Sequence, residues 1–151
     1  MKLTEGAILQ ATPLLNGSEF ESAHVYLAEY NSSGAVGFIF NQPYRRNLNE
    51  LAEFSKSRSF PLYKGGPVGD GSLYFLHNRP DIVGGGTPVA DGIYLAGDFK
   101  KAVSAINSLV LLKNNIKLFI GYCGWDEGEL ETEIEEGSWL VKVKTPAQSI
   151  F

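Results

Sequence analysis

The chain has almost none of the residues that covalent cross-links require. Its 151 residues include one cysteine, which excludes an internal disulfide and fits a reducing compartment. No apolar run approaches the roughly 18 residues that a membrane-spanning helix needs. Glu5 and Gly6 come too early in the chain for a secretory signal. We therefore expect a cytoplasmic protein that makes no membrane contact.

An excess of positive charge is also absent. The formal net charge is −4, which argues against direct DNA binding and against a surface built mainly to hold phosphate groups. The composition, 44% hydrophobic and 20% charged, is ordinary for a globular protein. The length predicts a single domain over residues 1–151, long enough to bury roughly 68–70% of its unfolded surface.

The most distinctive stretch of the sequence runs from Ile116 to Val143. Alternating apolar residues over 116–120 predict a strand. Glycines at 121, 124 and 128 then predict a tight turn into a helix, because a residue without a Cβ atom permits positive φ. Gly124 and Trp125 would lie in that turn.

A short helix and a further strand are predicted to complete this stretch. Leu130 and Ile134 lie four residues apart, on one face of a helix. Carboxylates near its start favour the positive end of the helix dipole, and Gly137 is suited to end it. The alternation over 139–143 then predicts a strand.

Hairpins dominate the rest of the chain. The turn at 31–34 should join strands over 23–30 and 35–40, and Asp91-Gly92 should join 88–90 to 93–95. Asp98 is expected to cap the longest helix, whose apolar spacing continues to Val110. Further strands are predicted over 7–11, 62–64 and 72–77, and a short helix over 48–54. The pattern indicates an α+β fold with about three helices and a largely antiparallel sheet.

A series of short motifs from about Gly6 to Pro146 resembles the YqgE/AlgH family of bacterial proteins. The motifs are Ala11-Thr-Pro-Leu14, Val25-Tyr-Leu27, Gly34-Ala-Val-Gly-Phe38, Asn41-Gln-Pro43, Gly65-Gly-Pro-Val68, Gly121-Tyr122, Gly124-Trp125, Gly128, Leu130-Glu131 and Trp139-Leu140. The resemblance implies a branched, largely antiparallel sheet, partly closed into a small barrel with helices around it. The family is mostly uncharacterised, and some members are labelled transcriptional regulators.

This chain departs from the family pattern at several positions. It has Glu21-Ser22-Ala23 where members often carry a basic residue, Glu129 where glutamine is common and Cys123 where a smaller residue is common. It also ends at Phe151, before the C-terminal segment expected of longer members. These departures bear on any role that would rest on a basic patch near residue 20 or on the C-terminal segment.

Cys123 with His24 and His77 is the one set that suggests a nucleophile or a metal site. A reactive thiolate needs a base or positive charge beside it, and zinc needs further ligands. A small buried thiol is the favoured interpretation, with both histidines on strand surfaces. No catalytic residue, metal site or cofactor is predicted.

The acidic run over 126–136 contains seven carboxylates but lacks the spacing of an EF-hand loop. A solvated helix face is favoured, with Trp125 and Trp139 as core anchors. Tyr44-Arg45-Arg46 with Lys56 and Arg58 is favoured as a solvated loop rather than a nucleic-acid contact. The Gly65–Val68 motif lacks the lysine and hydroxyl of a phosphate-binding loop, so a structural turn is favoured.

The leading functional hypothesis is a non-enzymatic regulatory or protein-interaction module. Loop positions that match the family motifs are the predicted binding surface, because function more often lies in loops. That surface consists of Asn41, Pro43, Gly65, Gly66, Pro67, Gly124 and Trp125. The alternative is a small-molecule-binding domain or enzyme that uses the barrel mouth and Cys123. The partner is therefore an unknown protein or small molecule.

Overall fold

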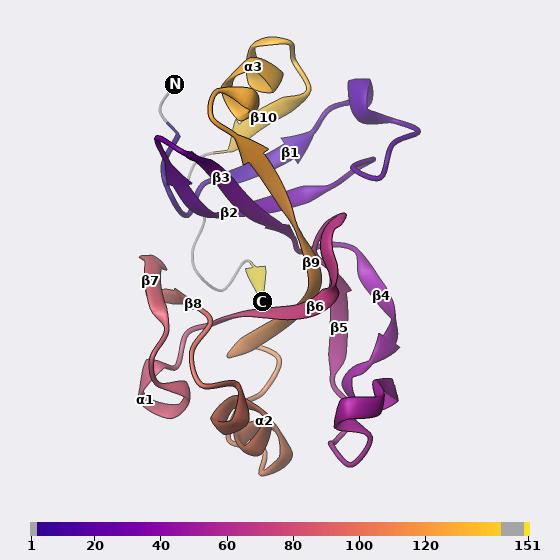
Figure 1. Cartoon of the computed structure of the whole chain (residues 1–151), viewed down its shortest axis with the longest axis vertical. Coiled ribbons are helices and arrows are strands. Elements are labelled where there is room, and N and C mark those ends of the chain that lie inside the picture. The colour runs from indigo at the N-terminus through magenta and orange to yellow at the C-terminus, as the bar shows by residue number, and fades with distance from the viewer. Residues whose placement is uncertain (1–2, 143–149) are drawn as a thin grey trace.

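A computed structural model of the chain describes residues 3–142 and 150–151 (Figure 1). Its sheet strands are β1 (Ile8–Ala11), β2 (His24–Asn31), β3 (Gly34–Ile39), β4 (Pro43–Asn47), β5 (Pro61–Lys64), β6 (Val68–His77), β7 (Thr87–Ala90), β8 (Ile93–Leu95), β9 (Ile116–Asp126) and β10 (Trp139–Lys142). The α-helices are α1 (Pro80–Val83), α2 (Phe99–Asn107) and α3 (Glu129–Glu135), and short 3-10 helices cover Pro13–Leu15, Leu48–Glu50 and Ala52–Phe54.

The strand β9 connects the two ends of the molecule (Figure 1). Its first half pairs with β6 and, in parallel, with β5, whereas its second half pairs with β3. The predicted turn at 121–128 is therefore wrong at its start, because the strand continues to Asp126. Gly121 has φ of 76°, and a Cβ there would lie 2.2 Å from the Gly66 carbonyl oxygen. The glycine thus permits a close backbone crossing within a continuing strand.

The sheet is open at both ends. Its order is β10-β1-β2-β3-β9-β6-β8-β7, with β4 and β5 branching from β9. Of the described pairs, only β5 with β9 is parallel. The predicted α+β class, the branched and largely antiparallel sheet and the number of about three helices are confirmed, although α1 lies where no helix was predicted. The partial closure into a barrel is not confirmed, since no pairing in the described residues joins β10 to β7.

Both predicted hairpins are present. β2 pairs with β3 from Asn31 opposite Gly34, and β7 pairs with β8 around Asp91 and Gly92. The last two residues have φ of 49° and 81°, as a type I′ turn requires. Local turn chemistry therefore specifies these two registers.

The helix α2 begins as predicted and ends early. The Asp98 side chain accepts a hydrogen bond from the Lys101 amide at 3.1 Å, which caps the first turn. The last helical residue is Asn107 rather than Val110, because Leu109 adopts a left-handed conformation with φ of 65°. The helix predicted over 48–54 is two 3-10 turns instead.

The buried side chains form three clusters along the long axis. One packs β1, β2, β3 and α3 around both tryptophans, and another packs α1, α2 and the 3-10 turns against β5 and β9. The third lies between them and takes residues from both halves of the sheet. α3 ends at Glu135, with Gly137 at φ of 86° just beyond it, as predicted.

Candidate partner-binding site

The predicted surface is partly buried. Gly65 and Gly66 are buried against the backbone of β9, so they do not form an exposed loop. The Gly65 amide donates to the Ile120 carbonyl at 2.8 Å, and its carbonyl accepts from the Ile39 amide at 2.9 Å. Pro67 is half-buried beside them. The structural-turn interpretation of this motif is the one that these contacts favour.

Trp125 also lies in the interior, with 7% of its surface exposed, in strand β9 rather than in a turn. Its neighbour Gly124 is exposed, close to Val68. Asn41 and Pro43 are exposed too, but the Asn41 side chain accepts from the His24 amide and donates to the Ser22 carbonyl, both at 2.9 Å. The exposed part of the predicted surface is thus Asn41, Pro43 and Gly124, and its binding role stays a prediction.

One carboxylate joins the two tryptophans. The indole rings of Trp125 and Trp139 meet edge to face at 6.0 Å between centroids. Both indole N–H groups donate to the same oxygen of Glu133, at 3.0 and 2.9 Å. The prediction of tryptophan core anchors is confirmed, and Glu133 is therefore more than one member of a solvated acidic face.

Cys123 is a buried thiol, as favoured from the sequence. Only 1% of its surface is exposed, and burial raises its pKa to about 12, so the reactive thiolate is suppressed. The prediction for His77 is wrong: this side chain is fully buried, with Nε2 2.9 Å from the Ala96 carbonyl and Nδ1 accepting from the Arg79 amide. The sequence predicted a strand over 72–77 but not that His77 at its end is covered by the rest of the chain.

No three His, Cys, Asp or Glu side chains gather as a metal site in the described residues. None of the helices described is long and apolar enough to cross a membrane.

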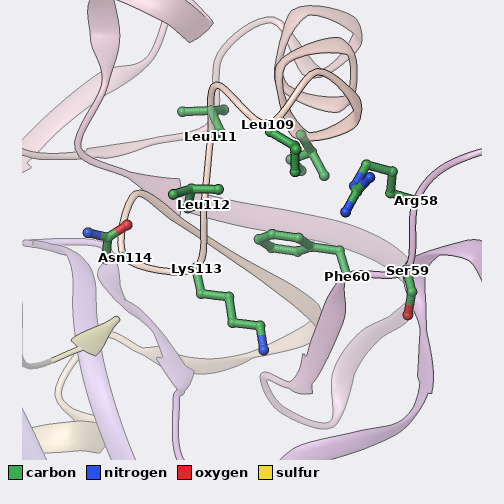
Figure 2. Close-up of a pocket in the computed structure, with 9 residues that line it drawn as sticks. Arg58, Ser59, Phe60, Leu109, Leu111, Leu112, Lys113 and Asn114 are labelled. Atoms are coloured by element: carbon green, nitrogen blue, oxygen red, sulfur yellow. The ribbon is translucent and has the colours of Figure 1, made fainter.

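A concave site, which the sequence alone did not indicate, lies where α2 ends. Figure 2 shows the Phe60 ring facing the leucines that follow α2, with Arg58 and Lys113 on different sides of it. The pocket has a volume of about 450 Å³. Its lining residues are Arg58, Ser59, Phe60, Ile106, Leu109, Leu111, Leu112, Lys113 and Asn114.

The floor of this pocket is buried apolar core. Phe60, Ile106 and Leu111 are 7%, 2% and 1% exposed and belong to the cluster around α2. The Asn107 side chain accepts a hydrogen bond from the Arg58 amide at 2.9 Å, which fixes the wall of the pocket to the end of the helix. The pocket is therefore preformed by packing and by one side-chain contact.

The rim of the pocket is apolar and exposed. Leu109 and Leu112 are 56% and 49% exposed, and the adjacent Val110 is 48% exposed. Leu109 adopts a left-handed conformation, which costs a leucine residue about 1–2 kcal/mol. Hydrogen bonds hold the backbone of this loop against the end of α2. The amides of residues 109–111 donate to the carbonyls of Ile106 and Ala105. Strain and exposed apolar surface thus coincide at one loop.

The charge of the pocket is opposite to that of the whole chain. Arg58 and Lys113 line it, and no carboxylate does. Both side chains are exposed in a protein whose formal net charge is −4. The arrangement can take up an apolar side chain and attract negative charge beside it.

Comparison with known proteins decides the family. The family described as AlgH-like (DUF179) matches residues 8–151. A UPF0301 protein of Chlorobium luteolum is 36% identical over 97% of this chain and 77% of its own length. A UPF0301 protein of Cytophaga hutchinsonii is 37% identical over 92% of this chain and 77% of its own. The chain belongs to the AlgH-like family.

Solved structures show that this AlgH-like chain shares its fold with proteins of distant sequence. The solution structure of the AlgH protein of Pseudomonas aeruginosa matches with a TM-score of 0.74 at 24% identity, over 97% of this chain and 83% of the other. A crystal structure of a protein from Corynebacterium diphtheriae matches with a TM-score of 0.76 at 20% identity, over 98% and 80%. At this level of identity the likeness is one of fold alone.

Proposed function

We propose that this AlgH-like chain is a non-enzymatic protein-interaction module with a regulatory role. Its pocket at the end of α2 would bind an acidic segment of a partner protein. One large apolar side chain of that segment fills the space above Phe60, and neighbouring carboxylates face Arg58 and Lys113. The observation that carries the proposal is the combination of exposed leucines with two cations and no carboxylate around one preformed pocket.

The dimensions and composition of the pocket support a side-chain anchor. Its volume of about 450 Å³ is at the small end of the roughly 300–1,000 Å³ of ligand pockets. Apolar anchors that fill preformed pockets carry much of the affinity of protein interfaces. Exposed charges on the rim set partner choice and association rate, since unlike charges attract before contact. A basic rim in an acidic protein thus selects an acidic partner segment.

The nucleophilic alternative receives no support from these contacts. It needs a reactive Cys123 thiolate, but burial holds the pKa of this thiol at about 12. The predicted surface of Asn41, Pro43 and Gly124 remains a second place where a partner could bind. Its test should use Gly124, because Gly66 and Trp125 are buried and their substitution would disturb the fold.

A peptide selection tests the proposal. Short peptides are selected from an unbiased display library on the immobilised chain, and their affinities are measured by fluorescence anisotropy. We expect acidic peptides with one large apolar residue. Leu109→Asn should weaken their binding by about tenfold, which corresponds to about 1.4 kcal/mol.

Leu140→Asn is the matched control for Leu109→Asn. Leu140 is 52% exposed, close to the 56% of Leu109, but lies on β10 and does not line the pocket. Asparagine tolerates the left-handed conformation of residue 109, so that variant should retain its stability to within about 1 kcal/mol. Equal binding by the two variants, or selected peptides that carry net positive charge, would overturn the proposed function.

A further inference from the structure

A lysine is buried between the two halves of the sheet. Lys117 of β9 is 8% exposed, and its Nζ donates a hydrogen bond to the carbonyl oxygen of Ile150 at 2.8 Å. The same nitrogen lies 4.0 Å from the centroid of the Tyr63 ring and 5.8 Å from that of Phe40. The ammonium group is thus held by two aromatic faces and one main-chain carbonyl.

Ile150 completes the cluster between the two halves. It is 1% exposed and packs with buried residues of β1, β2 and β3 from one half and of β6, β8 and β9 from the other. Figure 1 shows this end of the chain lying between the two parts of the sheet. Within the described residues, the bond from Lys117 is the one hydrogen bond that Ile150 makes. Among the described residues, apolar packing of Ile150 and Phe151 and the carbonyl contact with Lys117 therefore hold this segment.

A lysine is a costly choice for this position. Burial lowers its pKa to about 8, and a carbonyl offsets that cost less than a carboxylate would. The hydroxyl of Tyr26, which is 3% exposed and belongs to the same cluster, has no hydrogen-bond partner among the described residues. Apolar packing needs neither the Lys117 ammonium group nor the Tyr26 hydroxyl. Recognition of a peptide main chain uses such donors and acceptors.

We propose that the space beside Lys117 that Ile150 fills, here called the cleft, is a peptide-binding site whose resident ligand is the chain's own Ile150–Phe151 segment. Lys117 recognises a main-chain carbonyl, and the surrounding apolar residues take the isoleucine side chain. The segment is exchangeable, so a peptide supplied in trans can occupy the cleft after the segment leaves. This site is separate from the pocket at the end of α2, which shares none of its residues.

The test is the rate at which Lys117 reacts with acetic anhydride, measured by mass spectrometry. The exposed Lys113 serves as an internal reference within the same molecule. Ile150→Arg places a like charge beside the Lys117 ammonium group and should release the segment, which raises Lys117 labelling relative to Lys113 by about tenfold or more. Ile150→Val, a matched variant that keeps an apolar branched side chain, should label like the unaltered chain.

Two further readouts separate an exchangeable ligand from ordinary core. The tryptophans lie in a different cluster, so their near-ultraviolet circular dichroism reports the rest of the fold. We expect that signal to survive in Ile150→Arg, and the capped peptide acetyl-Ser-Ile-Phe-amide to restore slow labelling of Lys117 when added in excess. Unchanged labelling, loss of the tryptophan signal, or failure of the peptide to restore protection would each overturn the proposal.

Discussion

Two charged side chains in the interior, Glu133 and Lys117, each make more than one stabilising contact. The Glu133 carboxylate satisfies two buried indole N–H groups at once, and Lys117 places its charge against rings and a main-chain carbonyl. Both residues belong to types that usually face solvent. Placing either charge in the interior costs free energy, and the contacts of each side chain stabilise one cluster. The free energy of unfolding of suitable variants measures the balance of the two.

Glu133→Ala should lower the free energy of unfolding by about 2–4 kcal/mol, because it leaves two buried indole donors without an acceptor. Glu133→Gln keeps an acceptor oxygen and should cost about 1 kcal/mol. Glu135→Ala is the matched control, since Glu135 is exposed on the same helix. Urea unfolding measures all three. A loss in Glu133→Ala no larger than in Glu135→Ala would show that the shared contact contributes nothing.

Lys117 should make stability depend on pH in the alkaline range. Burial lowers its pKa from 10.5 to about 8, so between these values the unfolded chain binds a proton that the folded chain lacks. Stability from this group therefore rises with pH across that range and is lowest below pH 8.

Lys117→Met should remove this dependence. At pH 7 the variant should be more stable than the unaltered chain by about 1–3 kcal/mol, and the difference should shrink toward pH 10.5. Urea unfolding of both proteins at several pH values gives this difference directly. A variant that is less stable at pH 7 would mean that the ring and carbonyl contacts outweigh the desolvation of the ammonium group.

At the scale of elements, the chain is organised by the crossing of the Gly65-Gly66 segment over β9. An added Cβ at Gly65 would lie 2.3 Å from the Gly121 carbonyl oxygen, a backbone atom that cannot rotate away. Gly71 in β6 has open space around its Cβ position and no positive φ. The two glycines therefore differ in packing alone.

Gly65→Ala should cost about 3 kcal/mol or more, because it forces β9 and the crossing segment apart. Gly71→Ala should be neutral or stabilising by up to about 1 kcal/mol, since alanine restricts the unfolded chain. Thermal or urea unfolding of the pair tests this contrast. Equal stabilities would show that the crossing tolerates separation.

Local signals in the sequence were sufficient for the elements that depend on neighbours along the chain. The Asp91-Gly92 turn, the Asp98 cap and the end of α3 just before Gly137 follow from residues a few positions apart. The strand β9 was predicted to end too early, because Gly121 suggests a turn until the Gly66 backbone beside it is known. A close approach of distant segments has no local signature.

The candidate site was hidden for the same reason. Phe60 and Leu109 are far apart in the sequence, and Leu109 fits the helical spacing that predicted α2 to continue to Val110. Left-handed leucine is rare, so nothing local marked the helix end. The predicted binding surface consisted largely of glycines and a tryptophan. Gly65, Gly66 and Trp125 are in fact buried, where they form the crossing and the core.

At the scale of the whole molecule, charge is distributed unevenly. The net charge is −4, yet the pocket at the end of α2 presents two cations without a carboxylate. At the pocket itself, attraction by the two cations of the rim acts against the long-range repulsion between the acidic surface and an approaching acidic segment. Salt should therefore weaken binding at the pocket, with the effect concentrated on the association rate.

Arg58→Glu combined with Lys113→Glu should weaken binding of the selected acidic peptides by about tenfold or more and reverse its salt dependence, because salt then screens a repulsion instead of an attraction. Lys64→Glu combined with Lys142→Glu makes the same change in net charge at exposed lysines outside the pocket. Affinities at low and high salt compare the two pairs. A similar loss in both pairs would assign the effect to net charge rather than to the pocket.

The most direct measurement is a parallel peptide selection on the unaltered chain and on the Arg58→Glu, Lys113→Glu variant. The pocket account predicts acidic peptides with one large apolar residue from the first, and basic peptides with the same apolar residue from the second. Selection of the same peptides by both proteins, or of peptides whose binding survives Leu109→Asn, would contradict it and place the interaction elsewhere on the molecule.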